Sequence, residues 1–469
     1  MPLINTNYFT AGAQFPPEGD SVRYSNHNKY RVLYENTARA YGLLNPRQEV
    51  QPADGTIFEA LDGTRVGFPK YRINLFRKIS NFWKDMLFAF PPVVDSQAAT
   101  SNKEIQDVIR KTLVAAPKVA IDTSRYGTGV YLINLSRDDE VQIEAIEAPF
   151  WFPVVDPVDT RTVIGDVIAV PYNSNPEKPQ GQYGDRIRVS RYIIGEPVTV
   201  QTFELSGTVL KGGSQVHVGS IVEERAVVTV YNGYEIDHYG ESDYPDLMDV
   251  VSELNRRISG ISSVLDRHTN PNLVGPESAV SRDATGRPSI SAEGNYMPLD
   301  DTDHAKGVYY LTWEAGLEAN NEQIEKILDL FFALSNTSAT ALGLQEGAGA
   351  TQSGAALRKL LYSSFLRLSG LRRAHEESMI KVIRKVFPRI TVTVTWPDPF
   401  LDGSIERATA EELRLQSGIS TPAQSIARLD QVTSAEADQI AAAGRRNPTL
   451  ASGPTAGGGT GAQRGQTGG

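Results

Sequence analysis

The sequence predicts an α+β protein of two or more domains. Between residues 127 and 235, short β-branched segments alternate with Gly, Pro and Asn, which is typical of an antiparallel β region. On both sides of this region, apolar residues recur at three- and four-residue steps, which is the spacing of amphipathic helices. With 469 residues, of which 40% are hydrophobic and 22% charged, the chain can bury several hydrophobic cores.

Three helices are expected before the β region. Residues 28–44 and 71–90 carry the helical spacing, and Pro91 and Pro92 end the second helix. A shorter helix is expected at 102–113. The strands that follow are expected in "GTGVYLINL", "VQIEAI", "TVIGDVIAVPY", "RIRVSRYIIG", "VTVQTFEL" and "RAVVTVYNGYEI".

Two further helices bracket a small β insertion. Residues 245–268 carry one apolar stripe, and Asp246 near the start favours the helix dipole. The second helix is expected at 317–335. Between the two, "PSISA" and "GVYYLTW" predict short strands.

A long basic helix is expected from Ala355 to Val386, with eight Lys or Arg residues against two Glu. A loop composed mainly of Gly, Ala, Thr and Leu leads into it, and Gly370 is a plausible bend point within it. A strand at 389–396 and a small helical unit follow. The chain ends in a segment with 8 Gly in 17 residues, for which we expect disorder.

Charge and cysteine content limit the possible functions. The formal net charge of −10 argues against a broad basic surface for gripping DNA. The sequence has no cysteine, which excludes disulfides and thiolate zinc sites and fits assembly in a reducing cytoplasm. We expect neither a signal peptide nor a membrane-spanning helix, because no stretch approaches ~18 uninterrupted apolar residues.

Motifs of catalysis are largely missing from the sequence. It has no Gly-Lys dipeptide, which excludes a Walker A loop, and no His spacing that places two imidazoles on one helix face. "GESDY" offers Ser242 in part of a nucleophile elbow, but Tyr244 stands where the second glycine is needed. We therefore expect no enzymatic activity, no cofactor and no resident metal.

Two alternatives remain open from the residues alone. A metal-dependent nuclease could use a carboxylate cluster, because oxygen-rich clusters bind Mg²⁺; its members are Glu235, Asp237, Glu241, Asp243, Asp246 and Asp249. The alternative without a function for this cluster is a solvent-exposed junction before a helix. The basic, aromatic helix at 71–90 could instead lie on an anionic membrane, or be a core helix whose Lys and Arg reach the rim.

Several motifs, in their order along the chain, resemble those of tailed-bacteriophage portal proteins, the head-to-tail connectors. "HYGESDYPDLMDVVSELNRRISGISSVLDRHTNPNLVGP" is similar to the portal segment in which a Gly-x-Ser-acidic turn opens a helix; the matching residues are Gly240, Ser242, Asp243, Asn255, Ser259 and Pro271. "YRINLFRKISNFWKDMLFAFPP" resembles the N-terminal portal helix with its Asn and closing Pro, here Asn74 and Pro91.

Two further motifs lie nearer the C-terminus. "TQSGAALRKLLYSSFLRLSGLRRAHEESM" resembles the helix after the tunnel loop, entered through Ser353, Gly354 and Leu357. "QSGISTPAQSIARL" resembles the crown, with Gly418 and residues 420–422 making the turn.

The resemblance implies a set of parts. It assigns 1–244 to the wing, 245–268 to a stem helix, 269–315 to the clip, 316–335 to the second stem helix, 336–352 to the tunnel loop, 353–403 to the wing again, 404–446 to the crown and 447–469 to a disordered tail. Such proteins form rings of about twelve copies at one capsid vertex of the virion, assembled in the host cytoplasm. The implied partners are double-stranded DNA in the channel, the terminase large subunit, a head-completion adaptor, and the major capsid and scaffolding proteins, with no membrane.

The resemblance also implies functional residues. Small, weakly polar side chains in the tunnel loop would touch DNA without gripping it; these are Ala339, Thr340, Ala341, Gly343, Gln345, Gly347, Gly349 and Thr351. Arg256 and Arg257 would line the stem. An electrostatic seam between subunits would use Asp243, Asp246, Arg367, Arg372 and Arg373.

Overall fold

The chain is α+β in the computed structural model. The structure describes residues 9–36, 72–96, 102–135, 140–174, 184–214, 216–235, 238–269, 317–342, 361–397, 411–430, 432 and 434–446, with short strand segments at 58–59, 65–66, 273–276, 281–282, 288–289, 296–299 and 309–310. The backbone divides into two compact units, residues 1–87 with 115–378 and residues 88–114 with 379–469. Within the described residues, no helix is long and apolar enough to cross a membrane.

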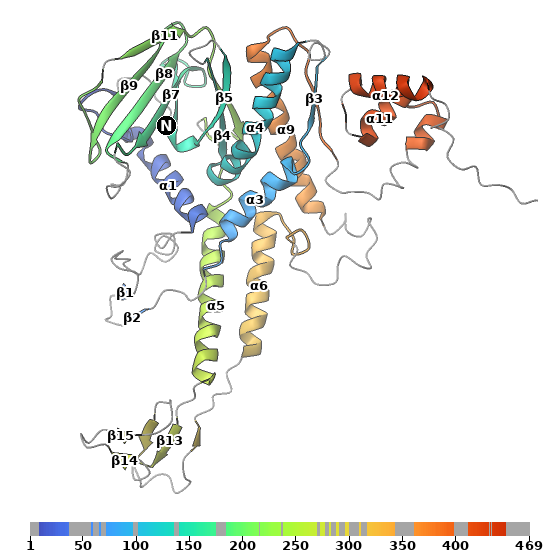
Figure 1. The fold of residues 1–469 in the computed structure, drawn as a ribbon. Helices are drawn as coiled ribbons and strands as arrows, with labels where there is room; N and C mark the ends of the chain where they lie inside the picture. Colours follow the sequence, from blue (N-terminus) through green and yellow to red (C-terminus); the bar gives the residue numbers. More distant parts are fainter. Residues whose placement is uncertain are drawn as a thin grey trace, which may run out of the picture. The chain divides into compact units, whose positions relative to one another are not determined.

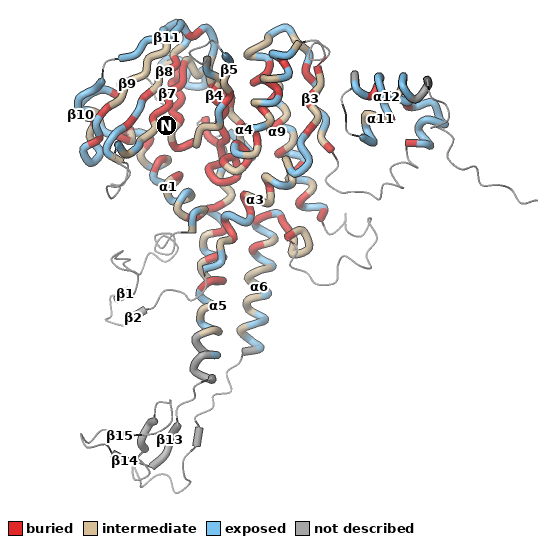
Figure 2. Tube along the Cα trace, in the orientation of Figure 1, coloured by how far each residue is buried: buried red, intermediate tan, exposed pale blue. Residues whose placement is uncertain are grey.

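The antiparallel β region is confirmed. Strands β6 (Trp151–Val155), β7 (Val163–Tyr172), β8 (Arg186–Ile193), β9 (Pro197–Ser206) and β10 (Val209–Lys211) form a meander in that order, and β11 (His217–Ile221) pairs with β9. A second sheet has the order β12 (Val227–Tyr231), β4 (Thr128–Leu135), β5 (Val141–Ile146). Figure 1 shows β7, β8 and β9 side by side, and in Figure 2 buried residues concentrate on β7 while β11 is exposed.

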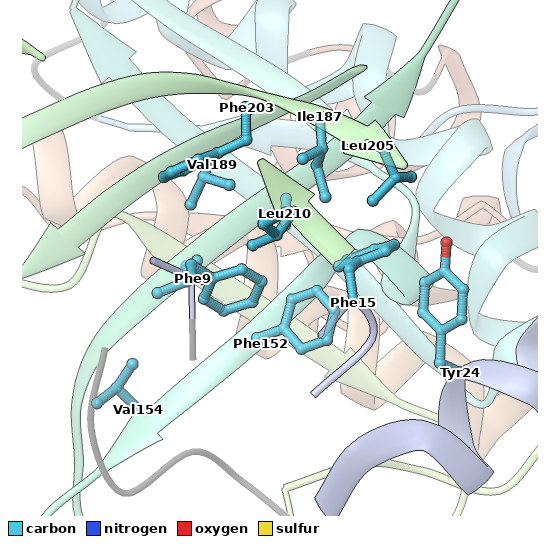
Figure 3. Close-up of a cluster of buried hydrophobic side chains, with 12 residues drawn as sticks. Phe9, Phe15, Tyr24, Phe152, Val154, Ile187, Val189, Phe203, Leu205 and Leu210 are labelled. Atoms are coloured by element: carbon cyan, nitrogen blue, oxygen red, sulfur yellow. The ribbon is translucent and has the colours of Figure 1, made fainter. Parts of the chain in front are cut away.

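The N-terminal arm completes the core of the larger sheet. Phe9 and Phe15 are fully buried, and their rings meet Phe152 at centroid distances of 5.2 and 6.2 Å (Figure 3). Tyr24 of helix α1 (Ser21–Glu35) stacks edge-on against Phe15. This N-terminal segment therefore supplies aromatic core residues, whose burial is favourable by about 25 cal/mol per Å² of apolar surface.

Two of the early helices differ in length from the prediction. α1 begins at Ser21 and ends at Glu35, because Asn36 adopts a left-handed conformation (φ 53°) that caps the helix. Helix α4 runs from Lys103 to Tyr126, well past residue 113, and contains Pro117. Helix α3 (Leu75–Phe88) lies within the predicted range and stops before Pro91.

The helices on either side of the insertion lie where the periodicity predicts them. A short 3-10 turn at Pro245–Leu247 leads into α5 (Met248–Thr269), and α6 (Leu317–Ser335) runs beside it (Figure 1). Between them, β13 (Leu273–Pro276) pairs with β16 (Tyr296–Leu299) and β17 (Tyr309–Tyr310), and β14 (Ser281–Arg282) pairs with β15 (Pro288–Ser289). The predicted helix-insertion-helix arrangement is thus present.

The long helix is α9, from Tyr362 to Val386. Its expected first turns from Ala355 onward, and the entry residues Ser353, Gly354 and Leu357, lie outside the described residues. The helix continues through Gly370. Val382 and Ile383 near its end are fully buried, which confirms an amphipathic rod.

The second unit has strands and helices of its own. Strand β18 (Thr393–Thr395), shorter than the predicted 389–396, pairs antiparallel with β3 (Val93–Asp95). Residues 411–416 are helical, followed by α11 (Pro422–Asp430) and α12 (Ser434–Arg446). Asp95 accepts hydrogen bonds from the backbone and hydroxyl of Ser434, which fix the start of α12.

Candidate functional site

The Gly-x-Ser-acidic turn, residues 240–243, is a junction at which several elements meet. Gly240 approaches Gly127 so closely that a Cβ at residue 240 would lie 2.1 Å from the Gly127 carbonyl oxygen. Gly127 has a φ of +80° and directly follows α4, as a left-handed residue after a helix often does. Gly240 therefore has no space for a side chain, and Gly127 has neither the space nor the backbone conformation for one.

Ser242 and Asp243 cap the end of α4. The Ser242 hydroxyl donates to the Arg125 carbonyl at 2.6 Å, and the Asp243 amide donates to the Ser124 carbonyl at 3.0 Å. The last carbonyls of a helix have no hydrogen-bond donor within the helix, so the turn supplies donors to the end of α4. The Ser242 oxygen also accepts from the Tyr244 amide at 3.1 Å, which fixes the turn itself.

The Asp243 carboxylate is held by three donors. One oxygen accepts from the Ser124 hydroxyl at 2.6 Å, and the other accepts from the Asn232 side-chain amide at 2.7 Å and from the Arg367 guanidinium. Arg367 comes from α9 and lies 4.8 Å from the centroid of the Trp83 ring on α3. A carboxylate so held sets the positions of α3, α4, α9 and β12 relative to the start of α5.

Tyr244 and Asn255 connect α5 to α3. The Tyr244 hydroxyl lies 2.8 Å from the Ser80 hydroxyl and donates to the Phe76 carbonyl at 3.2 Å. Burial raises the pKa of the Tyr244 phenol far above its ordinary value, so it remains a neutral donor. The Asn255 side chain accepts from the Ile73 amide at 2.9 Å, just before α3 begins.

Asn74 serves the start of α3. Its side-chain oxygen accepts from the Arg77 amide at 2.9 Å, which is the bond of an N-cap, and its side-chain amide donates to the Tyr34 carbonyl at 2.9 Å. Asn74, Gly240, Ser242, Asp243 and Asn255, quoted above for the portal resemblance, thus all take part in one connected junction.

The polar side chains of the junction form structural contacts between elements. The Ser242 proton is directed at a carbonyl, and Asp243 is neutralised by Arg367. His375, which lines the same region with Trp83 and Leu371, is fully buried, and burial lowers its pKa to about 3. The imidazole is therefore neutral at physiological pH.

Asp243 and Arg367, both predicted for a seam between subunits, bind each other within a single chain, because Arg367 of α9 reaches the turn that opens α5. The seam between subunits stays a prediction. The other three residues predicted for the seam lie differently: Asp246 and Arg373 are exposed and Arg372 is half-buried.

The predicted channel residues fall in different settings. Arg256 and Arg257 both bind Glu253, one turn earlier on α5, at 2.7 Å. Ala339, Thr340 and Ala341 are half-buried in a turn in which Ser338 accepts from the amides of Ala341 and Leu342. Gly343, Gln345, Gly347, Gly349 and Thr351 lie outside the described residues.

The carboxylate cluster does not converge on a common point in the described part of the chain. No group of three His, Cys, Asp or Glu side chains there could hold a metal ion. Asp243 is engaged by Arg367, and Glu235 lies 3.2 Å from His238 instead. Asp237 falls outside the described residues.

The aromatic face of α3 is part of the core. Phe76, Ile79, Trp83 and Leu87 are each at most 2% exposed, while Arg77 and Lys78 face solvent. The face that the membrane alternative needs is thus packed inside the protein.

Sequence reasoning missed three buried arginine-carboxylate pairs. Two of them, Asp20 with Arg23 and Asp122 with Arg125, have i,i+3 spacing and could have been found from it. Arg225, two residues before β12 begins, binds Asp166 of β7 at 2.8 Å, and no local spacing predicts that contact.

Comparison with known proteins gives weak likenesses. No protein-family model and no curated protein matches the chain. The neck of a native GTA particle computed with C12 symmetry aligns with a TM-score of 0.40 and 11% identity, covering 76% of this chain and 88% of that one. The neck of an empty GTA particle computed with C6 symmetry aligns with a TM-score of 0.35 and 11% identity, over 76% and 89%. TM-scores below 0.5 do not establish a common fold, so the function is argued from the chain's own elements.

Proposed function

We propose that the chain is a portal protein, a subunit of a ring at one vertex of a phage-like capsid through which DNA is packaged and ejected. The observation that carries the proposal is the pair α5 and α6, which brackets a β insertion and is joined by the Gly240–Asp243 turn to α9. The helix pair would be the stem, the insertion the clip, residues 336–352 the tunnel loop, and residues 404–446 the crown.

The helix pair is incomplete as a single copy. Leu330 and Leu334 of α6 and Leu265 of α5 are 50%, 41% and 47% exposed. Further along the two helices, Ile261 and Ile324 are only half-buried. Two helices cover little more than one face of each other, and in a ring the neighbouring copies would cover the rest.

The charge of the stem suits sliding DNA. Glu318, Glu322, Glu325 and Asp329 are all exposed and follow steps of four, three and four, which places them on one face of α6. Arg256 and Arg257 both form ion pairs with the Glu253 carboxylate. Each cation paired with a phosphate adds salt-sensitive affinity, so a channel with few available cations lets DNA move.

Asp243 is the residue that would distinguish a nuclease. Its engagement by Arg367 takes one of the six carboxylates of the cluster on which that alternative depended. A structural role, without catalysis, fits the junction better.

The test is the assembly of purified full-length protein, measured by negative-stain electron microscopy and native mass spectrometry. Rings of about twelve copies with a central hole are expected. A monomer or dimer that persists over a range of protein and salt concentrations would overturn the proposal.

The tunnel loop has its own test. Replacing residues 339–351 by Gly and Ser of equal length should leave ring assembly intact and reduce the packaging or retention of DNA. Val158→Ser, at a side chain that is 94% exposed, is the control. DNA-filled particles at the normal level from the loop variant would remove the loop from the mechanism.

A further inference from the structure

Strand β11 is an exposed edge of the larger sheet. All five of its residues, from His217 to Ile221, are exposed (Figure 2), and among the described strands it pairs with β9 alone. Alternate residues of an edge strand point their backbone amides and carbonyls away from the sheet. The outer side of β11 is therefore a place where a further strand can join.

The other edges of this sheet are covered. Along β10, the Gly12 amide donates to the Leu210 carbonyl at 2.8 Å, and the Leu210 amide donates to the Ala13 carbonyl at 2.9 Å. At the opposite edge, every residue of β6 is buried. The exposure of β11 is thus particular to this strand and is not a general property of the sheet.

A row of paired residues crosses the sheet and ends on β11. Each residue of the row is paired with the next, and from β6 to β11 they are Phe152, Val167, Arg191, Thr199 and Val218. Paired residues lie on one face of a sheet, and this face carries the core, where Phe152 and Val167 are fully buried. Val218, at the end of the row, is 67% exposed. The apolar face of the sheet therefore continues onto β11, past the residues that bury it elsewhere.

A shift in register keeps a second apolar side chain on this face. Val218 is opposite Thr199 and Ile221 is opposite Pro197, so β11 has one more residue between the two pairs than β9, as in a β-bulge. Thr199 and Pro197 are two positions apart and share a face, so Val218 and Ile221 share it as well. Ile221 is 65% exposed. A bulge can protect an edge from pairing, but this one aligns two exposed β-branched side chains beside the outer backbone.

Exposed carboxylates gather at one end of β11. Glu223 and Glu224 follow the strand closely, and Glu196 lies beside them because its carbonyl accepts from the Val222 amide at 2.9 Å. Residues 216–222 contain no Lys, Arg, Asp, Glu or Pro. The surface is therefore apolar along the strand and negative at its end.

We propose that β11 is a docking site for an extended segment of another protein, which joins the sheet as an additional strand. The backbone edge fits an extended chain, the face with Val218 and Ile221 fits apolar side chains at alternate positions, and the carboxylates fit Lys or Arg at the end of the segment. Duplex DNA fits poorly, because it has no polypeptide backbone to pair and the carboxylates repel its phosphates. Two copies of this chain that paired through β11 would need a two-fold axis between them, which the proposed ring does not have.

The experiment uses purified full-length protein and a short fluorescent peptide of alternating Val and Thr with Lys at both ends, and it measures binding by fluorescence anisotropy. We expect binding below about 1 mM peptide. Val218→Lys should weaken it at least about tenfold, because a lysine on an edge strand opposes pairing and repels the basic peptide. Val158→Lys makes the same change at a side chain that is 94% exposed elsewhere, and it should leave binding unchanged. A peptide with Glu in place of Lys should bind at least about tenfold more weakly than the basic peptide.

Two N-methylated forms of the basic peptide test the backbone contact. Each form blocks one alternate set of amides, and in an added strand one set faces β11 while the other faces away. One form should therefore lose binding and the other should keep it. Equal binding of the two forms would show contact through side chains alone and overturn strand addition.

The remaining outcomes separate this inference from the proposed function. Failure of the basic peptide to bind, or equal binding to wild type and Val218→Lys, would overturn the docking site, while rings in the same samples would leave the portal proposal standing. Native mass spectrometry should show the same oligomers for wild type, Val218→Lys and Val158→Lys. Loss of oligomers in Val218→Lys alone would show that β11 joins copies of this chain and would overturn docking of another protein.

Discussion

Asp243 and Arg367 form an ion pair between the turn that opens α5 and the long helix α9, although 124 positions separate them in the sequence. The Asp243 side chain is 6% exposed and Arg367 is 20% exposed. The pair is intramolecular, so it connects the proposed stem to the helix that follows the proposed tunnel loop. A displacement of α9 at Arg367 would act directly on the start of α5.

Removing one partner of this pair should be costly. Arg367→Met leaves a buried carboxylate without its cation, and such changes destabilise by about 3 kcal/mol. We expect a lower midpoint of urea unfolding, and a double-mutant cycle with Asp243→Asn should recover part of the loss. Arg373→Met, at an exposed position on the same helix, should change stability by less than about 0.5 kcal/mol. Equal effects of the two arginine variants would show that the pair contributes nothing specific.

The sequence allowed the elements to be predicted better than their contacts. Periodicity located α3, α5 and α6 closely, because their apolar faces are regular. It failed at Asn36, where a left-handed cap ends α1, and at Pro117, which α4 tolerates. At Asn36 a single residue outweighed the pattern, whereas at Pro117 the helix continues through a residue that usually ends one.

The candidate site was predicted in part. Gly240, Ser242 and Asp243 were identified as a turn, but their partners Gly127, Ser124 and Arg367 come from distant elements, and no spacing rule connects them. Asp243 was therefore assigned to a neighbouring subunit. An exposed acid and a distant basic helix look the same from the sequence whether they meet in one chain or between two.

The N-cap of α3 gives a second prediction. Asn74→Ala removes the acceptor for the Arg77 amide and should cost about 1 kcal/mol. Asn74→Asp keeps that acceptor and adds a favourable charge at the helix start, but it loses the donor to the Tyr34 carbonyl. We expect its thermal midpoint to lie between those of the wild type and the alanine variant. An aspartate variant no better than alanine would assign the stability to the Tyr34 contact.

Glu253 controls the charge of the proposed stem lining. Glu253→Gln removes one negative charge beside Arg256 and Arg257, so the purified protein should bind double-stranded DNA more tightly. The gain should fall as salt increases, as measured by fluorescence anisotropy from 50 to 200 mM salt, a range over which phosphate contacts weaken strongly. The triple variant with Arg256→Gln and Arg257→Gln should return to the wild-type affinity. A gain that survives in the triple variant would place the DNA contact elsewhere.

Asp122 makes the stability of the first unit depend on pH. Its side chain is 2% exposed and binds Arg125, and one carboxyl oxygen has no hydrogen-bond partner among the described groups. Burial raises the pKa of Asp122 to about 7, against the attraction of Arg125. The folded state therefore holds this proton more tightly than the unfolded state, in which the pKa is near its ordinary value of 3.8.

The sign of the effect follows from proton linkage. Because the folded state binds more protons between about pH 4 and pH 7, stability should fall as pH rises through this window and level off above it. Asn at position 122 still accepts the hydrogen bond from Arg125 but carries no proton to lose. The stability of Asp122→Asn relative to wild type should therefore rise from pH 4 to 7 and stay constant above 7. Thermal midpoints at pH 4, 5, 6, 7 and 8 measure this difference, and a difference that does not change with pH would show that Asp122 ionises in the fold at its ordinary pKa.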